Sequence, residues 1–248
     1  MPIGVRPSGM KTHNLHSWNV SLENALAIQK NLRAWIITEG ECPNPRLVGR
    51  ISLISNSENE NSATVQACIT IKEPATDRLM ERKVAIKTTK FPLHPGLYSF
   101  RKMPAVVAAL NKLKRIPDVF VCDGRGITGE DSFGVASHVG LITSVPTIGI
   151  RPIRPKHIAG SLCEERGSFL RVVEGGQVAV ILRVLDGCDP LLVSPAHRIS
   201  MAESIQRILE MIPAETPLRE YLQAIYPEAG HNNEVPVQLK LVKSATGR

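Results

Sequence analysis

The chain has 248 residues, of which 43% are hydrophobic, and it carries a formal net charge of +7 at pH 7. This length can bury a sizeable core, in one large domain or two small ones. No apolar run approaches the roughly 18 residues of a membrane helix, and residues 1–10 lack the apolar stretch of a secretory signal, so we expect no membrane partner.

Cysteine content and charge narrow the class of protein further. The five cysteines are odd in number and show no CxxC or Cys/His spacing, which predicts free thiols in the cytoplasm and argues against a zinc site. The modest, scattered excess of basic residues makes nucleic acid a possible partner without requiring one.

The first half of the sequence predicts one helix and then three strands. The Ser21 hydroxyl can accept hydrogen bonds from a first helical turn, and apolar residues recur on one helical face from Leu22 to Ile36. Two prolines in the run 42–45 break the chain after this helix. Strands rich in Val, Ile and Thr are predicted over residues 47–54, 63–72 and 83–89, with a polar hairpin loop over 55–62.

The second half alternates helices with short apolar strands. Strands over 119–122 and 147–150 are apolar on both faces, which is typical of central parallel strands. Pro104 permits a kink or a break in the helix that contains it. The remaining predicted elements are helices over 97–114, 132–143, 200–211 and 218–224, and a late hairpin over 178–185 and 191–193.

This order of elements predicts the fold class. An antiparallel three-strand meander followed by parallel β-α-β units is the arrangement of a ribonuclease H-like fold. We therefore predict an α/β protein with a mixed sheet, the meander plus parallel strands, flanked by helices. No repeat or linker divides the sequence, so we expect a single domain over 1–248 with loose tails at 1–15 and 228–248.

The most informative motif places Asp123 at the end of the apolar strand 119–122, followed by Gly124, Arg125 and Gly126. In an open sheet, ligands collect at the carboxyl ends of the central strands. A carboxylate at that place is where phosphate-cutting enzymes put a metal ligand. The simpler alternative is that Asp123 and Gly124 only begin a turn.

Five motifs extend over most of the chain: PLHPGL at 92–97 with FR at 100–101, the run 117–126, FGVASHVG at 133–140, PTIG at 146–149, and VSPAHRIS at 193–200. Together they resemble the endonuclease V family, whose members nick nucleic acid near deaminated adenine (inosine), a step of DNA repair. The resemblance runs from about His16 to about Tyr226. It implies a ribonuclease H-like fold, a Mg²⁺ cofactor and a nucleic-acid partner.

Several positions that carry the chemistry of this family hold other residues here. The resemblance implies a first catalytic Asp where Ile51 stands, two residues after Gly49, and a catalytic Glu where Lys102 stands. It retains the third carboxylate as Asp123. The family's lysine falls on Pro152. Its late acidic residue falls near Leu222, with Glu220 close by, and the tyrosine of its wedge falls on Leu93.

These replacements predict the loss of metal-dependent cleavage. Mg²⁺ is held by one or two carboxylates together with substrate phosphates, and it activates the attacking water. At about 4 Å, a Lys–Asp pair is worth about 4 kcal/mol at an effective dielectric constant of 20. We therefore expect no cofactor and a vestigial Asp123 that is ion-paired with Lys102. Mg²⁺ would bind at Asp123 only if an intact site exists.

The protein could still bind nucleic acid after losing the ability to cleave it. The resemblance makes Gly124, Arg125 and Gly126 candidates for the base pocket, and backbone N–H groups left open at these glycines would face a flipped base. The family's wedge loop corresponds to residues 93–96, which could separate bases through Leu93 or be only a proline-stiffened turn. The wedge-loop candidates are Leu93, His94, Pro95 and Gly96, and phosphate contacts are expected from Arg101, Lys102, Arg125, Arg151, Arg154 and Lys156.

Three functions remain open at this point. The leading prediction is an endonuclease V-like protein without cleavage activity that binds nucleic acid containing the deaminated base inosine. The second is an active inosine-specific endonuclease with a rearranged site. The third is a fold repurposed for small-molecule chemistry around Lys102, Asp123 and His94, where a lysine beside a carboxylate could transfer protons. We expect His138 and His197 to be structural.

Overall fold

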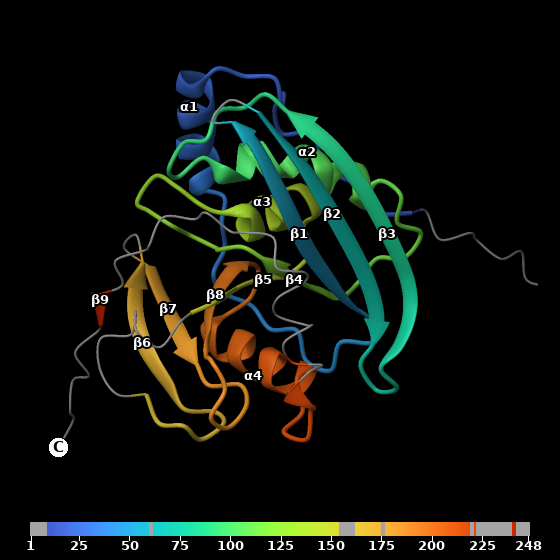
Figure 1. Ribbon diagram of the computed structural model, residues 1–248, viewed down its shortest axis with the longest axis vertical. Coiled ribbons are helices and arrows are strands. Elements are labelled where there is room, and N and C mark those ends of the chain that lie inside the picture. The colour runs from blue at the N-terminus through green and yellow to red at the C-terminus, as the bar shows by residue number, and fades with distance from the viewer. Residues whose placement is uncertain are drawn as a thin grey trace, which may run out of the picture.

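A computed structural model describes residues 9–59, 62–153, 162–174, 177–218, 221 and 240–241. Within them, nine strands form one sheet in the order β3-β2-β1-β4-β5-β8-β7-β6-β9 (Figure 1). The helices are α1 Leu22–Arg33, α2 Tyr98–Leu110, α3 Val135–Thr143 and α4 Met201–Met211. The strands are β1 Val48–Asn59, β2 Ser62–Glu73, β3 Arg78–Thr89, β4 Val119–Asp123, β5 Thr147–Pro152, β6 Phe169–Glu174, β7 Gln177–Leu182, β8 Leu191–His197 and β9 Lys240–Leu241.

The antiparallel meander β1-β2-β3 is confirmed, but its strands are longer than predicted. The pairing of β1 with β2 continues through Ser57↔Ala63 to Asn59↔Ser62. The predicted hairpin loop over 55–62 is therefore wrong. Polar residues fit there because a sheet that faces solvent on one side accepts them at the exposed positions of each strand.

The centre of the sheet is parallel, as predicted. β4 runs parallel to β1 on one side and to β5 on the other, whereas β5 pairs antiparallel with β8. The ribonuclease H-like mixed sheet flanked by helices is thus confirmed. Strand β6, which pairs antiparallel with β7, was not predicted, because six residues without a strict apolar–polar alternation give a weak strand signal.

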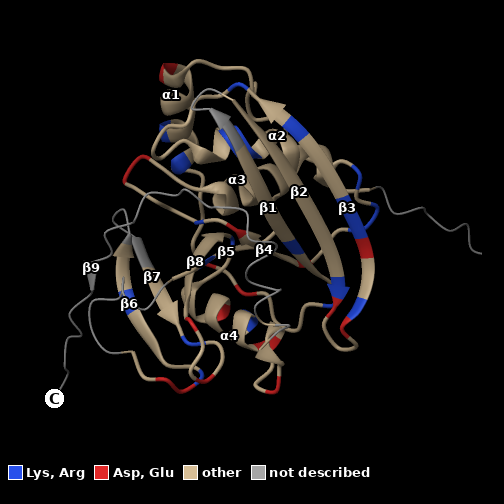
Figure 2. Cartoon of the chain, viewed as in Figure 1, with Lys and Arg blue, Asp and Glu red and all other residues tan. Residues whose placement is uncertain are grey.

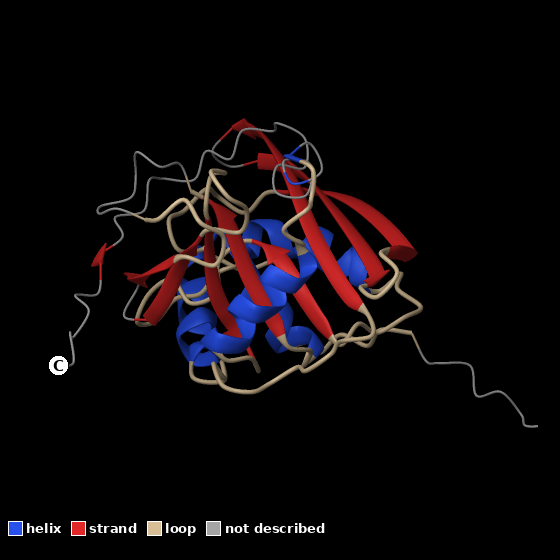
Figure 3. Cartoon of the chain, turned by 90° about the horizontal axis from the view of Figure 1, so that it is seen from below, coloured by secondary structure: helices blue, strands red, loops and turns tan. Residues whose placement is uncertain are grey.

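Helices cover both faces of the sheet (Figure 3). One face packs on α2 and α3 in an apolar cluster that contains Ile51 and Cys122. The opposite face packs on α4 in a cluster that contains Val119 and Val121. Because side chains alternate along a strand, β4 sends its odd-numbered residues, Asp123 included, to the α4 face.

Of the two predicted loose tails, the structure describes residues 9–15 and 240–241. Met10 is buried and its N–H donates to Leu113 O, and the His13 N–H donates to Ile142 O. The backbone is therefore not loose at Met10 and His13, which are bonded just beyond the end of α2 and to α3, whereas residues 1–8 of the predicted tail lie outside the described residues. Near the other end, β9 pairs with β6, and the predicted helix 218–224 lies mostly outside the described residues.

Basic residues recur along the edge strand β3 (Figure 2). An exposed strand edge invites pairing with other chains, and charged side chains on it oppose such pairing. This placement accounts for part of the net positive charge without a nucleic-acid partner. Among the described residues, none of the helices combines the length and the apolar character that crossing a membrane would require.

Candidate functional site

Asp123 stands at the carboxyl end of β4, and it is ion-paired with Arg50 of β1. Arg50 Nη2 forms an ion pair with Asp123 Oδ1, and the two side chains are 20% and 19% exposed. Burial raises the pKa of the Asp123 carboxyl, while Arg50, a hydrogen bond from the Leu53 backbone and the charge of Lys102 oppose that shift. The charge of Lys102 thus favours the ionised form of Asp123, as predicted, but the ion pair that the structure describes is the one with Arg50.

The strand register shows which residues of β1 share a face of the sheet with Asp123. Ile51 pairs with Cys122, has no exposed surface and lies in the apolar cluster on the α2 and α3 face. An acid at position 51 would therefore point away from Asp123. By the alternation of side chains, Arg50 and Ser52 share the face of Asp123. Ser52 is the β1 position from which a second carboxylate would reach an ion at Asp123.

The side chains around Asp123 do not fit a magnesium ion. Mg²⁺ demands oxygen ligands in an octahedral arrangement and resists losing its waters. Ser52 offers one hydroxyl, while Arg50 and Lys102 bring positive charge toward the carboxylate. In the part of the chain that is described, no group of three metal-ligating side chains comes together. Glu220 lies outside that part.

The predicted wedge loop and the predicted glycine turn meet at one small pocket. Gly96 of the loop and Gly124 and Arg125 of the turn line it together with Tyr98 and Ser99 at the start of α2. Leu93 is 40% exposed and does not line the pocket, and neither do His94, Pro95, Gly126 and Arg151. The structure thus gathers three of the eight predicted binding residues around one cavity.

The N–H groups of Gly124 and Gly126 are bonded to β5 and β8, contrary to the prediction of open N–H groups. The Gly124 N–H donates to Ile150 O, and the Gly126 N–H donates to Ser194 Oγ at 3.0 Å. A Cβ at Gly126 would lie 2.6 Å from Pro195 O, so glycine is required there by close packing against β8. The turn therefore shapes the pocket and does not act as a backbone anion site.

Gln29 of α1 ties two walls of this pocket together. Its side chain is 1% exposed, and its Nε2 donates to Gly96 O at 2.8 Å and to Phe133 O at 2.9 Å. Gln29 was not predicted as a site residue, because a single glutamine on a helix face forms no sequence motif. Arg50 was not predicted either, although a lone cation in an apolar strand is a signal that an opposite charge lies nearby.

Arg101 is not available to bind phosphate. It is 3% exposed, and its guanidinium donates to Phe91 O and Ser62 O, both at 2.7 Å. The prediction that it contacts nucleic acid is wrong, because its charge serves to join the start of β2 to the segment that follows β3. Arg154 and Lys156 lie outside the described residues.

His138, His197 and Cys122 are buried, as expected of structural residues, and His16 is half-buried. His138 has no exposed surface, and its Nε2 lies 2.9 Å from His16 Nε2. Burial lowers the pKa of both of these histidines, and it lowers the pKa of His197 to about 4. Burial also raises the pKa of the Cys122 thiol, so this side chain is a poor nucleophile at neutral pH.

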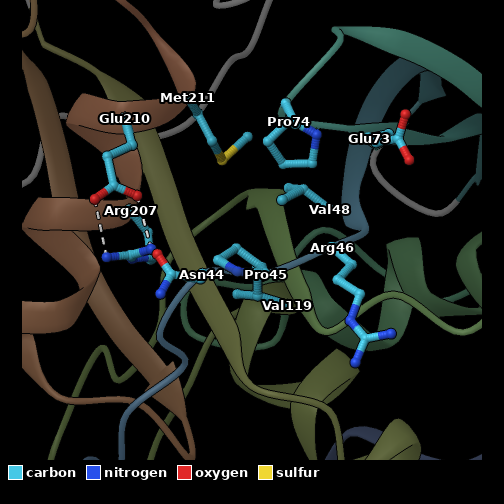
Figure 4. A pocket seen from close by; sticks show the side chains of 11 residues that line it. Asn44, Pro45, Arg46, Val48, Glu73, Pro74, Val119, Arg207, Glu210 and Met211 are labelled. Atoms are coloured by element: carbon cyan, nitrogen blue, oxygen red, sulfur yellow. Dashed lines mark hydrogen bonds and ion pairs between the residues drawn. The ribbon is translucent and has the colours of Figure 1, made fainter.

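A larger cavity, of about 380 Å³, lies where β1 and β4 begin (Figure 4). Asp123 stands at the other end of β4. Val48, Val119, Pro74 and Met211 give it apolar walls. On its rim, the guanidinium of Arg207 is already paired with a neighbouring carboxylate of α4. This cavity has no part in the arrangement around Asp123.

Comparison with known proteins gives consistent matches. The Endonuclease V family model matches residues 30–220. The endonuclease V of Nostoc punctiforme is 34% identical over 205 residues, which cover 82% of this chain and 92% of that protein. The crystal structure of the Bacillus subtilis endonuclease V is similar with a TM-score of 0.74 at 24% identity, covering 84% of this chain and 90% of that chain.

A structure with bound DNA is also similar. Endonuclease V of Ciona intestinalis, in complex with a 24mer DNA containing an inosine followed by a ribo-adenosine, superimposes with a TM-score of 0.63 at 18% identity. The match covers 79% of this chain and 91% of that chain.

Proposed function

The chain belongs to the endonuclease V family, and from that premise we propose that it binds inosine-containing nucleic acid without cutting it. The observation that carries the proposal is the ion pair between Arg50 and Asp123, with Lys102 close enough to act on the same carboxylate. These two cations take the place of the divalent ion on which phosphodiester cleavage in this family depends.

The electrostatics at Asp123 oppose metal binding. A divalent ion would have to displace the Arg50 guanidinium from Asp123 and then remain beside it and beside Lys102. Two like unit charges at about 4 Å repel by about 4 kcal/mol at an effective dielectric constant of 20, and the charge of a divalent ion doubles this repulsion. Without the ion, nothing in this set lowers the pKa of an attacking water or neutralises charge on the phosphate oxygens.

Other observations support binding of the inosine base. The pocket between Gly96 and Gly124 lies where residues 93–96, the predicted wedge loop, meet residues 124–126, the predicted base-binding turn. Arg125 lines the pocket, and Arg151 follows Ile150, the β5 residue that pairs with Asp123. A similar fold binds inosine-containing DNA in the Ciona complex. We further propose a cytoplasmic location, since all five cysteines are free.

The test compares binding and cleavage of a labelled strand that carries one inosine with those of a matched strand that carries guanine. We expect salt-sensitive binding that prefers the inosine strand and is equal in EDTA and in Mg²⁺. We expect no cleavage product with Mg²⁺ or Mn²⁺. Metal-dependent nicking near inosine that disappears in Asp123→Asn would contradict the loss of cleavage, and an equal affinity for both strands would contradict base recognition.

A further inference from the structure

Ser99, in the first turn of α2, carries a buried hydroxyl with no hydrogen-bond partner. The residue has no exposed surface, and it lines the pocket between the wedge loop and the glycine turn. Among the described residues, nothing accepts from or donates to its Oγ. Buried polar atoms are nearly always hydrogen-bonded, so an unpaired one beside a pocket points to a bound group as its partner.

Other polar groups of the pocket are already engaged. The Gly124 N–H is bonded to Ile150 O, and Thr128 Oγ1 lies 3.1 Å from Ser132 Oγ. The Gly126 N–H, behind the turn, is bonded to Ser194 Oγ. Ser99 Oγ is therefore the buried side-chain atom of this pocket with hydrogen-bonding capacity to spare, among the residues that the structure describes.

We propose that Ser99 is a specificity-determining residue whose hydroxyl donates a hydrogen bond to the six-position carbonyl oxygen of a hypoxanthine base in this pocket. The proposal rests on the function proposed above and names the chemical group that is read. A hydroxyl can reorient to donate or accept. A purine without the carbonyl would offer Ser99 Oγ no acceptor at this position and would gain nothing from it.

The pocket must widen before a base can enter. Its cavity is about 20 Å³, which is room for about one water molecule and not for a purine. Gly96 stands at a φ of +83°, with no atom within 4 Å of where a Cβ would be. Glycine adopts such a φ without strain, so Gly96 provides a joint at which residues 93–96 can turn outward. That movement would expose Ser99 to the incoming base.

The experiment measures the affinity of the full chain for three otherwise identical strands that carry inosine, unsubstituted purine or an abasic site. Purine lacks only the carbonyl and the adjoining ring N–H. We expect the wild-type protein to prefer inosine over purine by about fivefold, the effect of one ordinary hydrogen bond. Ser99→Ala should lose this preference while its affinity for the purine and abasic strands stays unchanged.

A second readout separates recognition from a structural role. Removing an unpaired buried hydroxyl relieves a cost, so Ser99→Ala should melt at the same temperature as the wild type or higher. The control is Ser137→Ala, whose hydroxyl donates to Ala196 O in the core, and which should melt lower but keep the inosine preference.

Each outcome is decisive. If the wild type prefers inosine over purine and Ser99→Ala does so equally, the role of Ser99 is refuted while the proposed function stands. If the wild type binds the inosine and abasic strands alike, the proposed function fails, and the role of Ser99 fails with it. A lower melting temperature for Ser99→Ala would assign its hydroxyl to the fold and overturn the inference.

Discussion

Three consecutive residues of β1 alternate between the two faces of the sheet. Arg50 turns toward Asp123, Ile51 is buried against α2 and α3, and Ser52 returns to the face of Asp123. The sequence predicted Asp123 correctly as the end of a central strand, because an apolar run followed by Asp-Gly is readable by itself. It could not decide which β1 residue faces Asp123, because a shift of one residue reverses every side chain and only the register with β4 fixes it.

This reading of the register predicts unequal effects of two neighbouring substitutions. Ile51→Asp places a carboxylate in the apolar cluster and should lower the free energy of unfolding by more than about 4 kcal/mol. Ser52→Asp places it beside both Arg50 and Asp123, where attraction and repulsion oppose each other, and should lower that free energy much less than Ile51→Asp does. Denaturant unfolding of both variants measures this. Equal tolerance of the two would show that the faces are assigned wrongly.

At the scale of elements, the long periodic segments were predicted well and their connections were not. Helix α1 begins after Ser21, whose hydroxyl accepts from the Asn24 N–H, as its cap position indicates. Helix α2 passes through Pro104 without interruption. The hairpin between β1 and β2 was mistaken for a loop because its polar residues follow the rules of turns, whereas the backbone pairing that continues the strands leaves no trace in composition.

The position of α1 predicts a measurable role for Gln29. Gln29→Leu removes two hydrogen bonds and their donor to the half-buried carbonyl of Gly96 and the buried carbonyl of Phe133, which should cost about 3 kcal/mol of unfolding free energy. The matched control is Gln206→Leu, because Gln206 makes an exposed bond to Glu210 on α4 and should change stability by less than about 0.5 kcal/mol. A similar effect in both variants would show that Gln29 does not hold the pocket.

For the whole molecule, the free energy of unfolding should depend on pH because burial lowers the pKa of three histidines. His16, His138 and His197 have lowered pKa values in the folded chain. The unfolded chain therefore binds protons more tightly, and stability falls as the pH drops below about 6.5, by up to about 1.4 kcal/mol per pH unit for each histidine. Asp123, whose pKa is raised, acts in the opposite direction, since its protonation favours the folded chain.

Replacing one histidine isolates its share of this effect. His138→Phe keeps an aromatic ring beside Trp18 and Phe100 and removes the group that titrates. Its unfolding free energy, followed between pH 7 and pH 5, should decline less steeply than that of the wild type by up to about 1.4 kcal/mol per pH unit. Parallel curves for the two proteins would show that His138 does not stay neutral in the fold.

Calorimetric titration of Mn²⁺ tests most directly the claim that cations occupy the place of the metal at Asp123. The wild-type protein should give no binding heat that Asp123→Asn removes, whereas the triple variant Arg50→Ala, Ser52→Asp, Lys102→Glu should bind one Mn²⁺ in a manner that depends on Asp123. Stoichiometric, micromolar binding of Mn²⁺ to the wild type, abolished by Asp123→Asn, would contradict the account.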